Sequence, residues 1–272
     1  MNDLQTRYDF ATTLIARAGE LAKSYAEGRS ALEIGSKGAQ DVVTNADRDV
    51  EVLIREALHE AFPEDRFFGE ESGPEEFDET SRIWVVDPID GTQPFASGLA
   101  DWCISIAFVE GMELKFGLVL APMRGELFRG RLFGGGEGFP ALLNDRPIHG
   151  HPGTSLKAGL TGVGHSPRVS TDRFLPVLEA VLREGGMFCR NGSGALTLCD
   201  VAAGRMVGYV EVHINSWDCL GAMAVLKASG HCISDNVSTR DRLLHGASIA
   251  VARDRAVYGF LAGLVGAGQP LP

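Results

Sequence analysis

Basic residues are few in this 272-residue sequence, and long apolar runs are missing. Lys and Arg number 25 against 36 Asp and Glu, and no Lys/Arg-rich run occurs. The net charge of −11 therefore argues against a nucleic-acid-binding surface. The apolar stretch nearest to membrane-spanning length, residues 109–121, is interrupted by Glu110, Glu113 and Lys115, so we expect no membrane span. The N-terminus has no basic segment followed by an apolar one, which argues against a signal peptide.

The cysteine pattern lacks the features of a disulfide framework or a zinc site. The five cysteines are odd in number and form no CxxC pair. They are typical of reduced core thiols in a cytoplasmic protein. We therefore expect a cytoplasmic protein that requires neither a membrane nor nucleic acid as a partner.

The periodicity of the first half predicts two helices and a largely antiparallel sheet. Apolar residues recur every three or four positions over 4–25 and again over 50–58, which indicates two amphipathic helices. Thr44 or Asn45 can cap the second helix, and Pro63 follows it. The last three predicted strands are joined by short turns and read as an antiparallel meander. The predicted strands cover residues 66–69, 83–87, 103–109, 114–121 and 126–131.

The second half alternates strands and helices, which predicts a mixed or parallel sheet with helices on its faces. Predicted strands cover 160–164, 187–190, 208–212, the vicinity of 232, and 248–251, and predicted helices cover 171–184, 195–203, 216–229 and 255–264. A stretch rich in glycine and turns, 134–152, marks the domain boundary. We therefore predict an α/β protein with an α+β domain at 1–140 and an α/β domain at 141–272.

Residues 84–92, Trp-Val-Val-Asp-Pro-Ile-Asp-Gly-Thr, are the most informative stretch. The apolar run predicts a strand buried on both faces, with Asp87 at its carboxyl end. Pro88 favours an extended Asp87 and a sharp turn before Asp90, so that both carboxylates face one hard cation. Gly91 lets the backbone approach a ligand, and the N–H groups of such a turn suit a phosphate. The string is also compatible with an ordinary surface turn.

Further acids lie at the ends of other predicted elements: Asp47, Glu70, Glu211 and Asp218. Carboxylates without a His/Cys set suit a hard cation such as Mg²⁺. Two such ions in one site can activate water and neutralise the leaving oxygen of a phosphate ester. Each acid also has an ordinary interpretation: the two aspartates favour helix N-termini, and the two glutamates belong to a solvated loop and an exposed strand face.

Several motifs together resemble the inositol monophosphatase family, within the Mg²⁺-dependent, lithium-sensitive sugar phosphatases. They are Asp41-Val42-Val43-Thr44 with Asp47, Gly69-Glu70-Glu71-Ser72, Asp87-Pro88-Ile89-Asp90-Gly91-Thr92, Gly192-Ser193-Gly194-Ala195, and Glu211 followed by Trp217-Asp218. They stand in the family's order from about residue 41 to 230 and cover most of the chain. The resemblance implies a layered αβαβα fold, two or three Mg²⁺ per site, a homodimer, and hydrolysis of a small phosphorylated polyol, most simply inositol 1-phosphate.

The resemblance also implies a role for each matching residue. Metal ligands would be Glu70, Asp87, the Ile89 carbonyl, Asp90 and Asp218. Glu70 and Thr92 would position the water for in-line attack on phosphorus, with Asp47 orienting the Thr92 hydroxyl. The N–H groups of Gly91 and Thr92 would hold the phosphate. The substrate site would also include Asp90, Gly194, Glu211 and Asp218.

The sequence departs from the family pattern at two places. Gln93-Pro94-Phe95 stands where the family often has Thr-Asn-Phe, and Ile214-Asn215-Ser216 where it often carries a histidine. Neither change removes a metal ligand, but both bear on substrate choice. Histidinol phosphate, fructose 1,6-bisphosphate or a 3′-phosphonucleotide therefore stay open as substrates. A regulatory or RNA-processing partner protein that retains the fold is the alternative of a different class.

Overall fold

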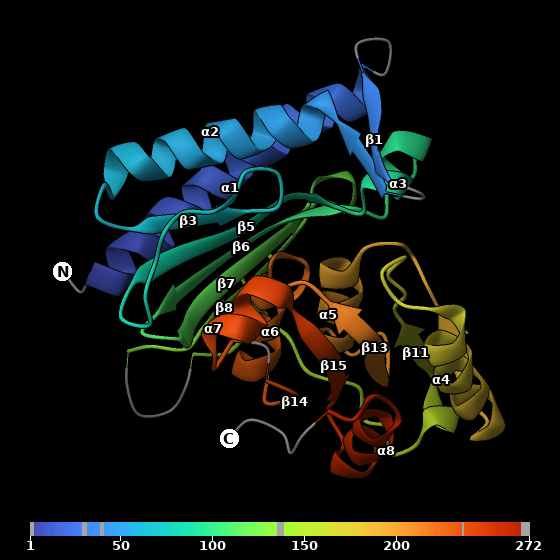
Figure 1. The fold of residues 1–272 in the computed structure, drawn as a ribbon. Coiled ribbons are helices and arrows are strands. Elements are labelled where there is room, and N and C mark those ends of the chain that lie inside the picture. Colours follow the sequence, from blue (N-terminus) through green and yellow to red (C-terminus); the bar gives the residue numbers. More distant parts are fainter. Residues whose placement is uncertain (1–2, 29–31, 39–40, 135–138, 236, 268–272) are drawn as a thin grey trace.

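The computed structural model describes residues 3–28, 32–38, 41–134, 139–235 and 237–267, and it has five layers (Figure 1). Helices α1 (Asp3–Glu27) and α2 (Asn45–Ala61) cover the outer face of a large sheet. Helices α5 (Gly194–Ala202) and α6 (Ser216–Ala228) form the middle layer, between that sheet and a smaller one. Helices α4 (Thr171–Arg183) and α8 (Arg255–Val265) cover the far side. The predicted αβαβα architecture is thereby confirmed.

The large sheet has eight strands in the order β10-β9-β8-β7-β6-β5-β3-β4. These are β3 (Arg66–Gly69), β4 (Gly73–Pro74), β5 (Arg82–Asp90), β6 (Cys103–Glu110), β7 (Glu113–Ala121), β8 (Glu126–Arg131), β9 (Leu142–Leu143) and β10 (Arg146–Pro147). Strands β3 and β5 pair in parallel, and the other neighbours pair antiparallel, including the predicted meander β6-β7-β8. The last strand of this sheet, β10, ends at Pro147, which lies beyond the predicted domain boundary at residue 140. The division of the chain into two domains stays a prediction.

The smaller sheet has five strands in the order β12-β11-β13-β15-β14. These are β11 (Leu160–Val163), β12 (Met187–Cys189), β13 (Gly208–Ile214), β14 (Cys232–Ile233) and β15 (Ala247–Ala252). Strand β11 pairs in parallel with β12 and β13, whereas β15 pairs antiparallel with β13 and β14. The sheet is therefore mixed, as the alternation of strands and helices predicts. None of the helices in the described ranges is long and apolar enough to cross a membrane.

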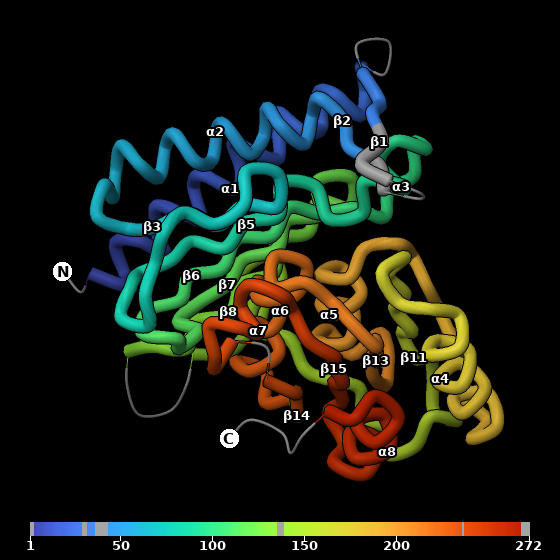
Figure 2. Tube along the Cα trace, viewed as in Figure 1, coloured from blue at the N-terminus to red at the C-terminus, as the bar shows by residue number. Residues whose placement is uncertain are grey.

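Two short strands precede α2, and the sequence patterns did not predict them. Strand β1 (Ile34–Gly38) pairs antiparallel with β2 (Asp41–Thr44) in a two-stranded sheet, and residues 39–40 lie outside the described ranges. The hairpin lies at the same end of the molecule as α3 (Thr92–Ser97) (Figure 2). Its glycine-rich first strand has no alternating apolar pattern, which is why the sequence patterns did not indicate a strand here. The sequence patterns also missed α3 and α7 (Arg240–His245).

Helix α2 begins where its capping residues predict. The Thr44 side chain accepts a hydrogen bond from the Asp47 backbone N–H, and the Asp47 side chain accepts one from the Thr44 N–H. This reciprocal capping box satisfies two N–H groups that the helix leaves unpaired. Val50, Ile54 and Leu58 form the buried face of the helix against the large sheet. The cap therefore holds Asp47, a predicted site residue, in a defined place.

Two glycines of the large sheet let the middle helix α6 approach closely. A Cβ added at Gly130 on β8 would lie 2.3 Å from the carbonyl carbon and oxygen of Ala224. A Cβ added at Gly117 on β7 would lie 2.3 Å from the carbonyl oxygen of Gly221. Because the backbone of α6 cannot retreat without disturbing the core on both of its sides, these positions admit no side chain.

We predict that Gly130→Ala destabilises the protein, because the added methyl group overpacks the contact with α6. The expected loss is about 1–3 kcal/mol of unfolding free energy, measured by urea denaturation. Gly259→Ala is the matched control, since a Cβ at that exposed α8 position meets nothing within 4 Å. The control should keep or slightly raise stability, because alanine favours helices. Equal midpoints for the two variants would contradict this account of the packing.

Candidate active site

Strand β5 carries both aspartates of the Asp-Pro-Ile-Asp string within the strand. The predicted sharp turn between Asp87 and Asp90 is therefore wrong, because β5 extends to Asp90 and its register with β6 shifts between the two acids. Pro88 has no N–H for the ladder, and the Ile89 N–H donates instead to Oδ1 of Asp87 at 2.9 Å. Such an irregularity redirects side chains near active sites. The register shift in β5 therefore sets the directions of the Asp87 and Asp90 side chains.

Three carboxylates from three elements converge on one point. Oxygens of Glu70, Asp87 and Asp218 all lie within 4.8 Å of one another. Glu70 follows β3, Asp87 lies in β5, and Asp218 lies in the first turn of α6. Among the described residues, no group donates a hydrogen bond to the buried Oδ2 of Asp87. An orphaned, buried oxygen within an all-oxygen set fits a hard cation such as Mg²⁺.

The electrostatics of these acids also favour a bound cation. Burial, followed by the neighbouring charges of Glu70, Asp90 and Asp218, raises the pKa of Asp87 well above its ordinary value. Burial and Asp218 raise the pKa of Asp90 to about 7, against the effect of its hydrogen bonds. The pKa of Asp218 is also raised, mainly by burial. Several carboxylates in this group thus resist ionisation. A positive charge among them would offset both the cost of burial and the repulsion between neighbouring carboxylates.

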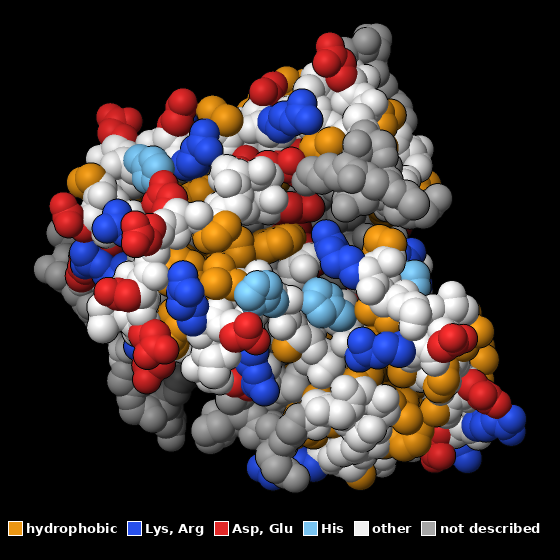
Figure 3. All heavy atoms as spheres, viewed as in Figure 1, with side chains coloured by type: hydrophobic (Ala, Val, Ile, Leu, Met, Phe, Trp, Pro, Cys, Tyr) orange, Lys and Arg blue, Asp and Glu red, His pale blue; other side chains and the backbone are white. Residues whose placement is uncertain are grey.

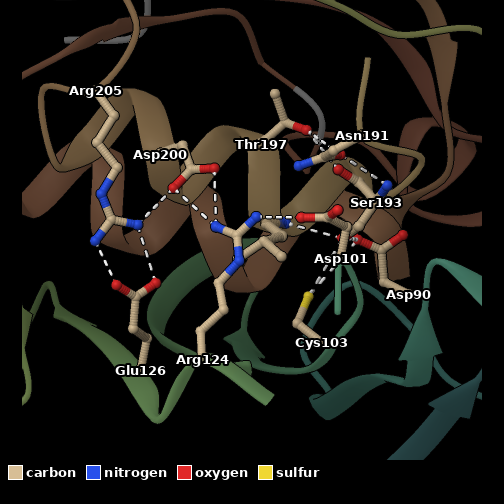
Figure 4. A network of polar contacts seen from close by, with 11 residues as sticks. Asp90, Asp101, Cys103, Arg124, Glu126, Asn191, Ser193, Thr197, Asp200 and Arg205 are labelled. Carbon is tan, nitrogen blue, oxygen red and sulfur yellow. Dashed lines mark hydrogen bonds and ion pairs between the residues drawn. The ribbon is translucent and has the colours of Figure 1, made fainter. Parts of the chain in front are cut away.

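Asp90, predicted as a metal ligand, lies beside this group and is held at the start of α5. Its Oδ2 accepts hydrogen bonds from the Ala195 N–H at 2.6 Å and from the Ser193 hydroxyl, and its Oδ1 accepts one from the Gly194 N–H at 3.3 Å. Figure 4 shows Asp90 close to Ser193 and to the buried thiol of Cys103. The N-terminus of a helix favours an anion, so α5 stabilises the Asp90 carboxylate.

A network of ion pairs connects α5 to the large sheet. Arg124 contacts both Asp101 and Asp200, and Arg205 contacts Asp200 at 2.7 Å and also Glu126 (Figure 4). Asp200 is buried on α5, while Glu126 begins β8. The network therefore connects α5, whose start binds the Asp90 carboxylate, to the large sheet, which contains Asp90 in β5.

The hydroxyl of Thr92 is oriented by two acceptors. Its Oγ1 lies 3.2 Å from Oδ1 of Asp47 and 3.2 Å from the Ile89 carbonyl oxygen. The other oxygen of Asp47 accepts from the Thr44 N–H at 2.8 Å and from the Thr44 hydroxyl. Burial raises the pKa of Asp47 to about 6 against these bonds. The structure thus brings together Asp47 and Thr92, as the resemblance implies.

Gly91 is required by its conformation and its surroundings. It precedes α3 with φ of 95°, in the left-handed region that favours glycine. A Cβ at this position would lie 2.8 Å from the Asp101 carbonyl oxygen and 3.1 Å from the Ser193 Cβ. The first N–H groups after Gly91 have no partner within α3, which suits the predicted contact with phosphate oxygens.

Most of the predicted site residues line one cavity of about 780 Å³. They are Glu70, Asp90, Gly91, Thr92, Gly194, Glu211 and Asp218. Figure 3 shows acidic side chains inside the hollow on this face of the molecule. Asp47, Asp87 and Ile89 are buried, and they lie beneath the residues that line the cavity.

Glu211 faces this cavity from β13. It is buried, and its Oε2 accepts a hydrogen bond from the Tyr209 hydroxyl at 2.6 Å. Burial raises the pKa of Glu211 to about 8, with further contributions from Asp218 and Asp90. The alternative of an exposed strand residue is therefore wrong, because β13 is central in its sheet and both of its faces are covered.

Two positioning residues were not found from the sequence. Glu51 of α2 is 2% exposed, and its carboxylate accepts hydrogen bonds from the N–H groups of Glu71 and Ser72, both at 2.8 Å. It thereby anchors the loop that presents Glu70. The available signal was an acid in the apolar stripe of α2, one helical turn after Asp47. Asn215 donates to Oδ2 of Asp218 at 2.9 Å.

Comparison with known proteins finds the family that the motifs resemble. A model described as the inositol monophosphatase family matches residues 3–267. Nus factor SuhB of Escherichia coli (strain K12) is 30% identical over 259 residues, which cover 94% of each chain. The structure of extragenic suppressor protein suhB from Bartonella henselae has a TM-score of 0.84 at 25% identity, covering 94% of this chain and 97% of that one. A Thermotoga maritima IMPase has a TM-score of 0.81 at 27% identity, covering 96% and 97%.

We predict that Glu51→Gln weakens metal binding, because a glutamine oxygen can satisfy only one of the two N–H groups and the loop of Glu70 loosens. The Mg²⁺ dissociation constant, measured by calorimetry, should rise about tenfold or more, as for other residues that support metal ligands. Glu56→Gln removes the same charge from an exposed position of the same helix and should leave binding unchanged. Equal Mg²⁺ affinities for the two variants would refute the role of Glu51.

Proposed function

Because this chain belongs to the inositol monophosphatase family, we propose that it is a Mg²⁺-dependent phosphomonoester hydrolase acting on a small phosphorylated polyol, most simply inositol 1-phosphate. The observation that carries the proposal is the convergence of Glu70, Asp87 and Asp218 at the cavity that Glu70, Asp218 and Thr92 line. Carboxylate clusters beside a positioned hydroxyl suit hydrolysis of a phosphate ester with activated water.

Glu70, Asp87 and Asp218 would hold the metal, with Asp90 and the Ile89 carbonyl oxygen beside them, at two or three ions per site. Bound Mg²⁺ supplies Lewis acidity, which lowers the pKa of water and offsets the charge of the phosphate. The orphaned Oδ2 of Asp87 supports this assignment. The hydrogen bonds of Asp90 to α5 leave its Oδ1 with one long N–H contact, at 3.3 Å, and thus with capacity for another ligand.

The residues around Thr92 would orient the attacking water. When the Thr92 hydroxyl donates to Asp47, its lone pairs are available to accept a hydrogen bond from that water. Glu70 supplies a second acceptor, and together they aim the water at phosphorus in line with the leaving oxygen. The N–H groups of Gly91 and Thr92 would hold phosphate oxygens. No covalent phosphoenzyme is required.

The leaving alcohol would lie toward Glu211 and Gly194. Glu211 already accepts one hydrogen bond from Tyr209, and its remaining lone pairs can accept from a polyol hydroxyl. A Cβ at Gly194 would lie 3.0 Å from Ile214 Cδ1, so a larger residue would fit only if the Ile214 side chain shifted. We propose that these residues bind the hydroxyl-bearing part of the substrate.

We also propose a cytoplasmic homodimer. Exposed apolar side chains gather on α4 and on the edge strand β12, which supports an interface between two copies. They are Leu175, Leu182, Met187 and Phe188, with exposed fractions of 51%, 50%, 67% and 46%. Helix α4 contacts β12, and exposed apolar side chains on neighbouring elements are typical of protein interfaces.

We predict that the purified protein releases phosphate from inositol 1-phosphate with Mg²⁺, and that excess chelator abolishes this activity. Asp90→Asn should lower kcat/KM about 100-fold, because it removes a negative charge that would hold the metal. A bound metal stabilises the transition state of phosphate ester hydrolysis by several kcal/mol. Asp172→Asn, an exposed acid on α4, is the matched control and should retain activity. Full activity in chelator, or in Asp90→Asn, would overturn the metal mechanism.

A second candidate function is a regulatory or RNA-processing role, which is favoured by relatives named Nus factor SuhB at 30–32% identity over about nine-tenths of this chain. It would use the outer surface of the same fold and would not require hydrolysis. We therefore expect both the wild-type chain and Asp90→Asn to complement an Escherichia coli strain that lacks Nus factor SuhB. Failure of both would contradict this second role, and complementation by the wild type alone would make it depend on the metal site.

A further inference from the structure

Arg124 joins two parts of the chain that each contact the candidate site. Its Nη1 lies 3.3 Å from Oδ1 and 3.2 Å from Oδ2 of Asp200, and its Nη2 contacts Asp101 (Figure 4). The side chain belongs to the short 3-10 helix Pro122–Arg124 between β7 and β8. The described residues that line the cavity do not include Arg124. Any effect of Arg124 on the chemistry must therefore pass through its two partners.

The first partner, Asp101, begins a segment that packs against the proposed phosphate-binding turn. Its carbonyl oxygen lies so close to Gly91 that an added Cβ there would approach it to 2.8 Å. The next residue, Trp102, is fully buried and contacts Phe95 of α3 edge to face, with the ring centroids 4.9 Å apart. The position of this segment therefore constrains both Gly91 and α3, which follows it.

The second partner, Asp200, lies on α5 and is 5% exposed. The start of the same helix donates two N–H groups to Asp90, as described above. Arg205 also contacts Asp200, at 2.7 Å, so α5 keeps one cation if Arg124 is removed. Within the described ranges, by contrast, the Asp101 carboxylate forms an ion pair with Arg124 alone. Loss of Arg124 would thus release the Asp101 segment rather than α5.

We propose that Arg124 is a positioning residue that fixes the turn at Gly91 and Thr92 relative to Asp90. The inference rests on the proposed phosphatase function, in which that turn holds the phosphate. A guanidinium presents several N–H groups in one plane, so it can bind two carboxylates at once, which suits a bridge between two segments. Misplacement of a substrate-binding group by about 1 Å is enough to cost about 100-fold in rate.

The test measures the affinity for inorganic phosphate, at saturating Mg²⁺, and the affinity for Mg²⁺, both by calorimetry. Arg124→Gln should raise the phosphate dissociation constant about tenfold or more and change the Mg²⁺ constant by less than about twofold, because Asp90 stays bound to α5. Asp101→Ala should give the same pattern. The double variant should lose no more than Arg124→Gln alone, because both changes break one contact.

Arg82→Gln is the matched control. Arg82 is also half-buried and also bridges two aspartates, with 3.2 Å to Asp3 and 3.0 Å to Asp65. Asp65 likewise keeps a second arginine, Arg7. Arg82 begins β5, at the end of the strand away from the cavity. Its replacement should lower the unfolding free energy much as Arg124→Gln does, but it should keep both affinities.

The outcomes separate this inference from the proposed function. Equal phosphate affinities for Arg124→Gln and Arg82→Gln would overturn the positioning role. A parallel loss of phosphate and Mg²⁺ affinity in Arg124→Gln would also overturn it, because general loosening of the fold affects both ligands. If the wild-type protein neither binds phosphate nor hydrolyses an ester, the proposed function fails. Hydrogen exchange of the amides at residues 91–103 then decides the inference: faster exchange in Arg124→Gln than in Arg82→Gln supports it, and equal rates refute it.

Discussion

Repulsion among buried carboxylates is the constraint on which this site depends. Asp87 and Asp90 are buried and Asp218 is half-buried. Burial raises the pKa of all three acids, and the charge of Asp218 further raises the pKa values of Asp87 and Asp90. The fold offsets part of this cost with the start of α5 at Asp90 and with the Asn215 side chain at Asp218. One oxygen of Asp87 keeps no hydrogen bond from the described residues. The arrangement is thus complementary to a positive charge.

The five layers make this concentration of charge possible. Both middle helices, α5 and α6, begin at the cavity, and they direct the positive ends of their dipoles toward the acids of β5. Close packing of α6 on glycines 117 and 130 holds one helix in place, and the ion-pair network of Arg124 and Asp200 holds the other. The chemistry therefore rests on a rigid scaffold, and both sheets contribute residues to one cavity.

The sequence patterns predicted the long elements well and the local irregularities poorly. Strands β3 and β8 have their predicted bounds. In the second half the predicted helices and strands occur in their predicted order, with β9, β10 and α7 as additions that were not predicted. The register irregularity of β5 was taken for a turn, because proline and glycine occur both in turns and at such irregularities. Glu51 was overlooked, because a helix position alone does not say which loop its side chain will meet. Buried acids at unusual positions in an apolar stripe are the signal for such residues.

The sequence alone determined the chemical groups and their family. Asp87, Asp47, Glu70 and Asp218 each stand in a short local motif. Residue types and spacings are sufficient to recognise these motifs without a structure. Only the tertiary structure decided that Asp90 is held at the start of α5 and that Glu51 supports the loop of Glu70. These contacts join residues far apart in the chain, and they depend on strand order, register and helix packing, which local patterns do not encode.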